Sequence, residues 1–187
     1  MEVKIMSASE LEDLYANHMF RYFPAPEIKP LSTLKQLLST GEYVSLAFIE
    51  DGQMIGYTLL IACDGKNACL LDYFAVLPQF RSGGRGSRIL KYLREHFIGK
   101  THQILIECEH PDFAPDRAQA LRRLRFYNSA GAKKAEIETK LFGVRYLVFA
   151  LTCDAHAEPL PVEEDIVFYY KKMVPEGKYD EEVEIYR

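Results

Sequence analysis

Hydrophobic and polar positions along the chain follow two different periods, and together they predict a mixed α/β fold. Apolar or alternating runs of strand length lie at residues 3–6, 43–49, 54–62, 68–76, 104–108, 135–141 and 145–151. Apolar positions at helical spacing follow residues 10–18, 31–38, 89–97 and 117–130. The first part of the chain is therefore expected to form a strand, two helices and a three-strand meander, and the second part to alternate helices with strands.

Turn and cap residues divide these runs. Asp51-Gly52 between two strand-like runs predicts a hairpin, because glycine tolerates the positive φ of such a turn. The hydroxyl residues expected to cap the first two helices are Ser7 or Ser9, and Ser32 or Thr33. The inward face of the helix at 117–130 is expected to carry Leu121, Leu124 and either Tyr127 or Asn128.

The last part of the chain differs in charge from the rest. Residues 155–161 are typical of a linker, and residues 163–173 predict an amphipathic helix with acids first and lysines last. Residues 160–187 hold eight acids and four bases, which equals the whole formal charge of −4, so residues 1–159 are neutral overall. We expect one domain at 1–153 and an acidic C-terminal extension at 154–187, whose acids lie on a solvated surface and whose helix covers the domain or forms a dimer contact.

Composition excludes several classes of protein. Of 187 residues, 48% are hydrophobic and 27% charged, a globular balance. A neutral body argues against nucleic acid as the main partner, and no apolar run approaches the ~18 residues of a membrane span. The first residues lack a basic stretch followed by an apolar one, so we expect a cytoplasmic protein. The four cysteines and five histidines show no zinc-ligand spacing, which predicts reduced thiols and no metal.

The most informative segment is LLDYFAVLPQFRSGGRGSRIL at residues 70–90, which predicts a strand, a glycine-rich turn and a helix. Small residues at 82–86 expose successive backbone N–H groups at a helix N-terminus, and such donors bind phosphate. Arg81 and Arg85 can add charge-assisted hydrogen bonds. The spacing does not fit a P-loop or a dinucleotide fingerprint, so the alternative is a turn that only links strand to helix.

The stretch Arg81-x-x-Gly84-x-Gly86, entered from Ala75-Val76-x-Pro78, resembles the acetyl-CoA-binding motif of the GCN5-related N-acetyltransferases, the GNAT superfamily. The segment from Arg125 to Gly131, with Phe126-Tyr127, is similar to the late Phe-Tyr-x-x-x-Gly segment of that family. The resemblance covers residues 2–152. It implies a GNAT-like mixed, mostly antiparallel central sheet flanked by helices, here followed by a C-terminal helical extension.

The resemblance also implies which residues hold acetyl-CoA. The backbone groups of Phe74 and Val76 would pair with the pantetheine arm. The pyrophosphate would be bound by the turn, whose residues are Arg81, Ser82, Gly83, Gly84, Arg85, Gly86 and Ser87. The sequence departs from the family where Ala120 stands in place of a frequent cofactor-contacting asparagine, and where Ala132 follows Gly131 in place of phenylalanine.

Three residues are candidates for the chemistry. The resemblance implies that Tyr127 protonates the departing thiolate; its alternative role is that of a core aromatic beside Phe126. An alkylamine is mostly protonated at neutral pH, so a base is required. Asp72, on the same strand face as Val76, and Glu107 could accept the proton or bind the substrate ammonium. For Asp72 the alternative is a strand-end carboxylate satisfied by its neighbours.

Other polar residues lie near these positions in the sequence. Glu109 alternates with Glu107 on the same predicted strand, and His110 could be the base instead, although a Pro-flanked loop more often carries a solvated histidine. The basic face of the late helix, with Arg117, Arg122, Arg123 and Arg125, is expected to be solvated or paired with acids.

Together these features predict an N-acetyltransferase that uses acetyl-CoA, without a metal, to acetylate a primary amine of a small molecule by direct attack in a ternary complex. Two alternatives remain open: a protein or peptide N-acetyltransferase, and a non-catalytic domain that senses acyl-CoA. We expect no nucleic acid or membrane partner, and a homodimer is an option that the sequence leaves open.

Overall fold

The computed structural model describes residues 1–187, except for the side chain of Pro26. The chain divides into two units: Met1–Asp64 with Leu71–Ile89 form unit 1, and Gly65–Leu70 with Leu90–Arg187 form unit 2. The fourth strand, β4 (Ala68–Val76), and the fourth helix, α4 (Arg85–Phe97), each have residues in both units.

Unit 1 contains strands in the order β1 (Glu2–Ile5), β2 (Tyr43–Glu50), β3 (Gln53–Ile61) and β4. The first two pairs, β1 with β2 and β2 with β3, are antiparallel. Asp51 and Gly52 have φ angles of 51° and 74°, the left-handed conformation that a two-residue hairpin turn needs. The predicted meander and its Asp-Gly turn are therefore confirmed.

Helical segments connect β1 to β2 in this unit. They are α1 (Ala8–Leu14), a π-helical segment at Tyr15–Met19, α2 (Phe20–Tyr22), a 3₁₀ turn at Ala25–Glu27 and α3 (Leu31–Ser39). Ser7 caps α1 in a capping box with Glu10, which confirms one of the two predicted caps. The predicted cap of α3 is wrong: Pro30 precedes the helix and no side chain caps it. Proline can start a helix because its fixed φ is already helical.

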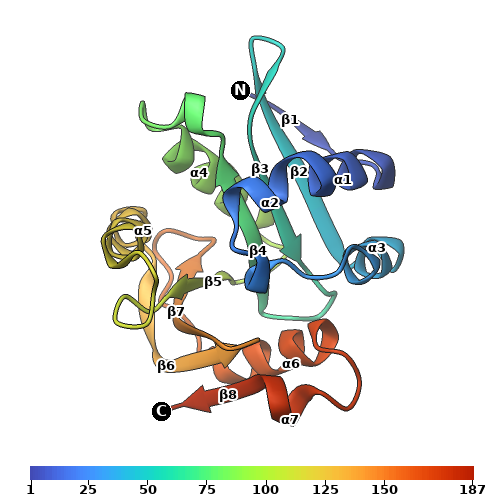
Figure 1. The fold of residues 1–187 in the computed structure, drawn as a ribbon. Coiled ribbons are helices and arrows are strands. Elements are labelled where there is room, and N and C mark those ends of the chain that lie inside the picture. The colour runs from blue at the N-terminus through green and yellow to red at the C-terminus, as the bar shows by residue number, and fades with distance from the viewer. The chain divides into compact units, whose positions relative to one another are not determined.

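The core of unit 1 is built from the apolar faces of these helices and strands. Leu11, Met19 and Leu34 from the helical segments are fully buried, as are Phe48 of β2 and Ile55 of β3. The helix α3 contacts both α1 and β2 (Figure 1). The core thus fixes the helical segments on the meander that leads into β4.

Unit 2 contains strands in the order β5 (Gln103–Glu109), β7 (Val144–Thr152), β6 (Lys133–Leu141) and β8 (Val183–Tyr186). All three pairs are antiparallel. Its helices are most of α4, then α5 (Arg117–Ser129), α6 (Glu163–Met173) and α7 (Tyr179–Glu182). The predicted mixed α/β fold with mostly antiparallel strands and flanking helices is confirmed. Among the described residues, no helix has both the length and the apolar character of a membrane span.

The end of the chain forms more structure than the sequence predicted. The amphipathic helix is present as α6, and its buried residues are Ile166, Tyr169, Tyr170 and Met173. The strand β8 was missed; it pairs antiparallel with β6, with Thr139 opposite Ile185 (Figure 1). All of residues 154–187 belong to unit 2. Part of the acidic stretch lies in β8.

The buried face of α5 differs from the prediction. Ala120 and Tyr127 are its buried residues, whereas Leu121 and Leu124 are half-buried and Asn128 is exposed. Ala120 and Tyr127 are seven residues apart, which is two helical turns. Tyr127 is thus placed on the inner side of α5, and Asn128 is not.

Candidate active site

The glycine-rich turn of unit 1 links β4 to α4. A 3₁₀ turn at Pro78–Phe80 follows the strand, and Ser82, Gly83 and Gly84 then have φ angles of 74°, 67° and 74°. A positive φ is uncommon for residues other than glycine, and Ser82 adopts one although it carries a side chain. The residues at 81–84 are exposed, and α4 starts directly after them at Arg85.

This conformation presents backbone donors to solvent. The N–H groups in the first turn of a helix have no partner inside the helix, and the helix dipole places partial positive charge there. The turn at 81–84 therefore has the backbone shape, exposure and polarity that an anion needs. Binding of the pyrophosphate by residues 81–87 stays a prediction.

The two arginines predicted to bind phosphate have partners within unit 1. Arg81 donates from Nε to the carbonyl oxygen of Val76 at 3.1 Å. Arg85 donates from Nε to Glu50 at 2.9 Å, and Arg88 also pairs with Glu50, at 2.6 Å. The hydrogen bond from Arg85 lowers the pKa of Glu50 below its usual value. The Glu50 carboxylate thus neutralises part of the positive charge at the start of α4.

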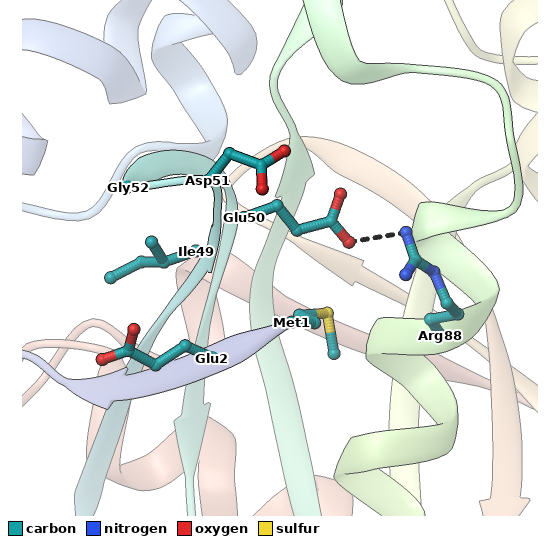
Figure 2. Close-up of a pocket in the computed structure, with 7 residues that line it drawn as sticks. All are labelled: Met1, Glu2, Ile49, Glu50, Asp51, Gly52 and Arg88. Atoms are coloured by element: carbon teal, nitrogen blue, oxygen red, sulfur yellow. Dashed lines mark ion pairs between the residues drawn. The ribbon is translucent and has the colours of Figure 1, made fainter.

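Figure 2 shows a polar hollow beside this ion pair, with a volume of about 380 Å³. Its lining residues are Met1, Glu2, Ile49, Glu50, Asp51, Gly52 and Arg88. Three of these side chains are carboxylates and one is a guanidinium. Because the three carboxylates would repel a phosphate, the hollow does not suit the pyrophosphate that the turn was predicted to bind.

The strand before the turn is held by a close approach of β3. A Cβ atom on Gly56 would lie 2.5 Å from the carbonyl oxygen of Ala75, so only glycine fits there. Leu77 donates its N–H to the carbonyl oxygen of Ile55 at 2.9 Å. Burial of whole residues, backbone included, alternates along the end of β4, where Asp72, Phe74 and Val76 are half-buried. Glycine at position 56 therefore determines where the backbone of Ala75 and Val76 lies.

Asp72 is surrounded by partners inside unit 1. Its side chain is 1% exposed and pairs with the Lys29 ammonium at 2.5 Å, and Lys29 is 7% exposed. Its second oxygen accepts a hydrogen bond from the Tyr43 hydroxyl at 2.6 Å. Burial, with the charge of Asp72, raises the pKa of Tyr43 well above its ordinary value. This geometry favours the alternative in which Asp72 is satisfied by its neighbours.

A second contact holds the segment that carries Lys29. The backbone N–H of Lys29 donates to the Tyr73 hydroxyl at 2.9 Å, and that hydroxyl donates to the carbonyl oxygen of Glu27 at 2.8 Å. The Lys29 ammonium also lies 5.1 Å from the centre of the Tyr73 ring. Asp72 and Tyr73, neighbours on β4, thus both hold the loop that carries Lys29. Asp72 binds the Lys29 side chain, and Tyr73 binds the backbone of the loop. No pattern in the sequence indicates Lys29 as a site residue, because an isolated lysine beside a proline is usually a surface residue.

Glu107 lies on β5 in unit 2 and is half-buried. Its Oε1 accepts a short hydrogen bond from the hydroxyl of Tyr170 on α6. That hydroxyl also lies 2.7 Å from Oγ1 of Thr139 on β6. Sequence reasoning gave Tyr170 no role at the site, because its helix was expected to cover the domain or form a dimer contact.

The neighbours of Glu107 along the chain have other partners. Glu109 is 8% exposed and pairs with Arg123 of α5 at 3.1 Å. His110 accepts a hydrogen bond from the backbone of Asp112 and lies 3.8 Å from Glu138. Of the acids on β5, Glu107 is the more exposed.

Tyr127 is 8% exposed, and its ring centre lies 5.0 Å from that of Phe126. Asp116 caps α5 by accepting a hydrogen bond from the N–H of Gln119 at 2.9 Å, which fixes the start of the helix that carries Tyr127. Burial raises the pKa of Tyr127 well above its usual value; Cys108 acts in the same direction and Arg123 opposes it. The phenol is therefore protonated at neutral pH and can donate a proton or a hydrogen bond.

Comparison with known proteins shows what this chain is similar to. Residues 42–131 match the family model described as the acetyltransferase (GNAT) domain. This segment of the chain therefore resembles a GNAT acetyltransferase domain. A comparison with curated protein sequences gives no match.

Solved structures share the GNAT fold over most of the chain. A Bacteroides thetaiotaomicron protein assigned to the GNAT family is 20% identical, with a TM-score of 0.68 over 90% of this chain and 93% of that one. The ribosomal-protein-S18-alanine N-acetyltransferase of Escherichia coli is 18% identical, with a TM-score of 0.59 over 85% and 97%. An aminoglycoside 6'-N-acetyltransferase complexed with coenzyme A is 14% identical, with a TM-score of 0.58 over 86% and 100%.

The matched GNAT segment contains every residue that the sequence predicted for the site. The turn at 81–87 and Asp72 lie in unit 1, and Glu107 and Tyr127 lie in unit 2. Lys29 and Tyr170, the partners that sequence reasoning missed, lie outside the matched range. No group of three or more potential metal ligands occurs among the side chains that the structure describes.

Proposed function

We propose that this GNAT protein transfers the acetyl group of acetyl-CoA to a primary amine of a small molecule by direct attack in a ternary complex. The observation that carries the proposal is the exposed turn of three left-handed residues at the start of α4, inside the matched acetyltransferase domain. The likeness to a structure that contains coenzyme A supports the choice of cosubstrate.

The residues of the turn fit the cosubstrate proposed for it. The backbone N–H groups of Ser82, Gly83 and Gly84 lie in an exposed turn directly before α4, where main-chain donors suit a diphosphate. Arg81 is exposed and can turn its guanidinium from the carbonyl of Val76 toward an anion. The backbone of Phe74 and Val76 would bind the pantetheine arm, as the family resemblance implies.

We assign the proton transfers to two residues of unit 2. The carboxylate of Glu107, which is half-buried as a whole residue, accepts a proton from the substrate ammonium. The freed amine nitrogen then attacks the thioester carbon, the carbon–sulfur bond breaks, and the nitrogen loses its second proton to solvent. The departing thiolate takes the hydroxyl proton of Tyr127, which is protonated at neutral pH, although burial raises its pKa and makes it a weaker acid than a free phenol. Asp72 is the second candidate for the proton acceptor, but its ion pair with Lys29 suits a positioning role better.

The first experiment separates an enzyme from a sensor. Polyamines, amino acids, aminoglycosides and peptides are screened for acetyl-CoA-dependent release of thiol. Tyr127→Phe should lower kcat by about 10²-fold, the contribution typical of general acid catalysis, while the Kd for acetyl-CoA stays unchanged. Tyr92→Phe, a tyrosine of α4, is the matched control and should leave both values unchanged. Binding without turnover on any amine would indicate the acyl-CoA-sensing alternative.

The same screen decides the class of acceptor. The likeness to an aminoglycoside acetyltransferase supports a small molecule, and the likeness to a ribosomal-protein acetyltransferase keeps a peptide acceptor as the alternative. Turnover on peptides alone would refute the small-molecule assignment. Arg81→Glu should weaken acetyl-CoA binding at least about tenfold by charge reversal, whereas Arg21→Glu, also exposed, should not.

A further inference from the structure

The C-terminal helix α6 reaches the strand that carries the proposed base. Its residues Ile166, Tyr169, Tyr170 and Met173 are buried, at spacings of three and four that form one face. Ile166, Tyr169 and Tyr170 are each 0% exposed. Two of these residues carry hydroxyl groups into the interior, and a buried hydroxyl requires a partner. The partners of the two tyrosines differ in kind.

Tyr169 and Tyr170 donate to chemically different acceptors. The Tyr169 hydroxyl bonds the backbone carbonyl oxygen of Ala68, a neutral group in β4. The Tyr170 hydroxyl bonds the carboxylate of Glu107 and contacts the hydroxyl of Thr139. The Tyr170 hydroxyl thus contacts a carboxylate, whereas the Tyr169 hydroxyl donates to a backbone carbonyl oxygen.

The direction of the hydrogen bonds follows from the number of protons. A phenol has one proton, and an ionised carboxylate is the stronger acceptor, so Tyr170 donates to Glu107. The Thr139 hydroxyl then donates to the phenol oxygen. Thr139 is fully buried and is held in the sheet by Tyr146 on one side and Ile185 on the other. The chain of donors thus runs from Thr139 through Tyr170 to Glu107.

This bond fixes one oxygen of Glu107 and is made to the ionised form of the carboxylate, the form that can act as a base. A carboxylate offers about four lone-pair sites, and the phenol occupies one of them. Burial raises the pKa of Tyr170 well above 10, and the charge of Glu107 adds to this effect. Tyr170 is therefore a donor throughout the pH range of an assay and does not itself titrate there.

We propose that Tyr170, outside the matched acetyltransferase segment, is a positioning residue that holds the Glu107 carboxylate in its ionised, oriented form. The inference rests on the proposed function, in which Glu107 accepts the ammonium proton. It gives the C-terminal helix a part in the reaction in addition to its packing. The other titratable groups beside this network are Tyr146 of β7, Cys108 and Glu109 of β5, and Arg123 of α5.

Tyr170→Phe tests the inference because it removes only the donor. Without the hydrogen bond to its charged form, Glu107 should gain its proton at a higher pH. The acidic limb of the kcat/KM profile should move up by on the order of one pH unit, the size expected for a hydrogen bond to a charged group. The Kd for acetyl-CoA should stay unchanged.

Tyr169→Phe is the matched control, with the same substitution one residue away on the same buried face. It should lower the unfolding temperature as Tyr170→Phe does but leave the pH profile in place. Thr139→Val provides a second variant in case Tyr170→Phe does not fold, and should shift the acidic limb in the same direction by a smaller amount. A second measurement, titration of the Glu107 carboxyl by ¹³C NMR in the full chain, reports the same change without turnover.

The outcomes separate the two proposals. Wild-type turnover with identical pH profiles for Tyr170→Phe and Tyr169→Phe would overturn the role of Tyr170 while the proposed function stands. If the wild-type chain acetylates no amine, the proposed function fails and the positioning role fails with it. If Glu107→Gln keeps full activity, Glu107 is not the base, and Tyr170 has no catalytic group to position.

Discussion

The ion pair between Lys29 and Asp72 gives the sharpest test of how unit 1 is organised. Replacing Lys29 by Met removes the ammonium and leaves the Asp72 carboxylate in a site where it is 1% exposed. Replacing Asp72 by Asn leaves the ammonium in the same surroundings. The double variant Lys29→Met with Asp72→Asn removes both charges and leaves the Tyr43 hydroxyl with an amide oxygen as acceptor.

The size of the effect follows from distance and burial. At 2.5 Å two unit charges attract by about 7 kcal/mol if the effective dielectric constant is 20, and loss of hydration offsets part of this. Breaking one side of a buried pair typically costs about 3–5 kcal/mol, because the remaining charge has no partner. For 187 residues the entropy of unfolding is roughly 0.4 kcal/mol per degree, so each single variant should lower Tm by about 10 °C.

Thermal unfolding followed by circular dichroism measures these shifts. The double variant should lose less stability than the sum of the two single variants, with a coupling of at least about 2 kcal/mol. Additive losses, or single losses below about 1 kcal/mol, would mean that the pair is not coupled, which would refute the reasoning.

The same variants separate two roles of Asp72. If Asp72 only holds the loop that carries Lys29, both single variants should impair the reaction to a similar extent. If Asp72 is the proton acceptor, Asp72→Asn should lower kcat by about 10²-fold or more and Lys29→Met far less. Steady-state kinetics of both folded variants below their unfolding temperatures makes this comparison.

Three further perturbations test other parts of the structure. Gly56→Ala places a Cβ 2.5 Å from a backbone oxygen of β4, so it should cost about 1–3 kcal/mol of stability and weaken acetyl-CoA binding in a calorimetric titration; unchanged binding would contradict the role given to that close approach. Glu50→Gln releases Arg85 from its carboxylate and should tighten acetyl-CoA binding by roughly threefold, with a steeper salt dependence. Burial raises the pKa of Cys108 to about 12, so a disulfide thiol reagent at pH 8 should label half-exposed Cys63 first, and Cys63→Ser should remove the fast phase.

Local patterns predicted most of the fold because the relevant interactions lie close together in the sequence. The Asp51-Gly52 turn, the capping box at Ser7 and the buried face of α6 each depend on residues a few positions apart. The strand β8 was missed because it has four residues, and it forms only because β6 offers an edge to pair with. A four-residue alternation carries too little information to predict a strand.

The candidate site also has a part that local sequence predicts and a part that depends on distant residues. The turn at 81–87 is a local motif, so its backbone could be predicted from the spacing of its glycines. The partners of Asp72 and Glu107 come from 43 and 63 residues away along the chain, and no local pattern indicates them. Sequence reasoning could therefore name the acids, but it could not say how each one is surrounded.

The surroundings give the two acids different expected chemistry. A cation and a phenol contact the two oxygens of Asp72, whose side chain is 1% exposed. Glu107 accepts a hydrogen bond from the neutral phenol of Tyr170. Two carboxylates that the sequence presents as equivalent candidates thus become one structural acid and one proposed base, because side chains from distant segments stabilise them differently.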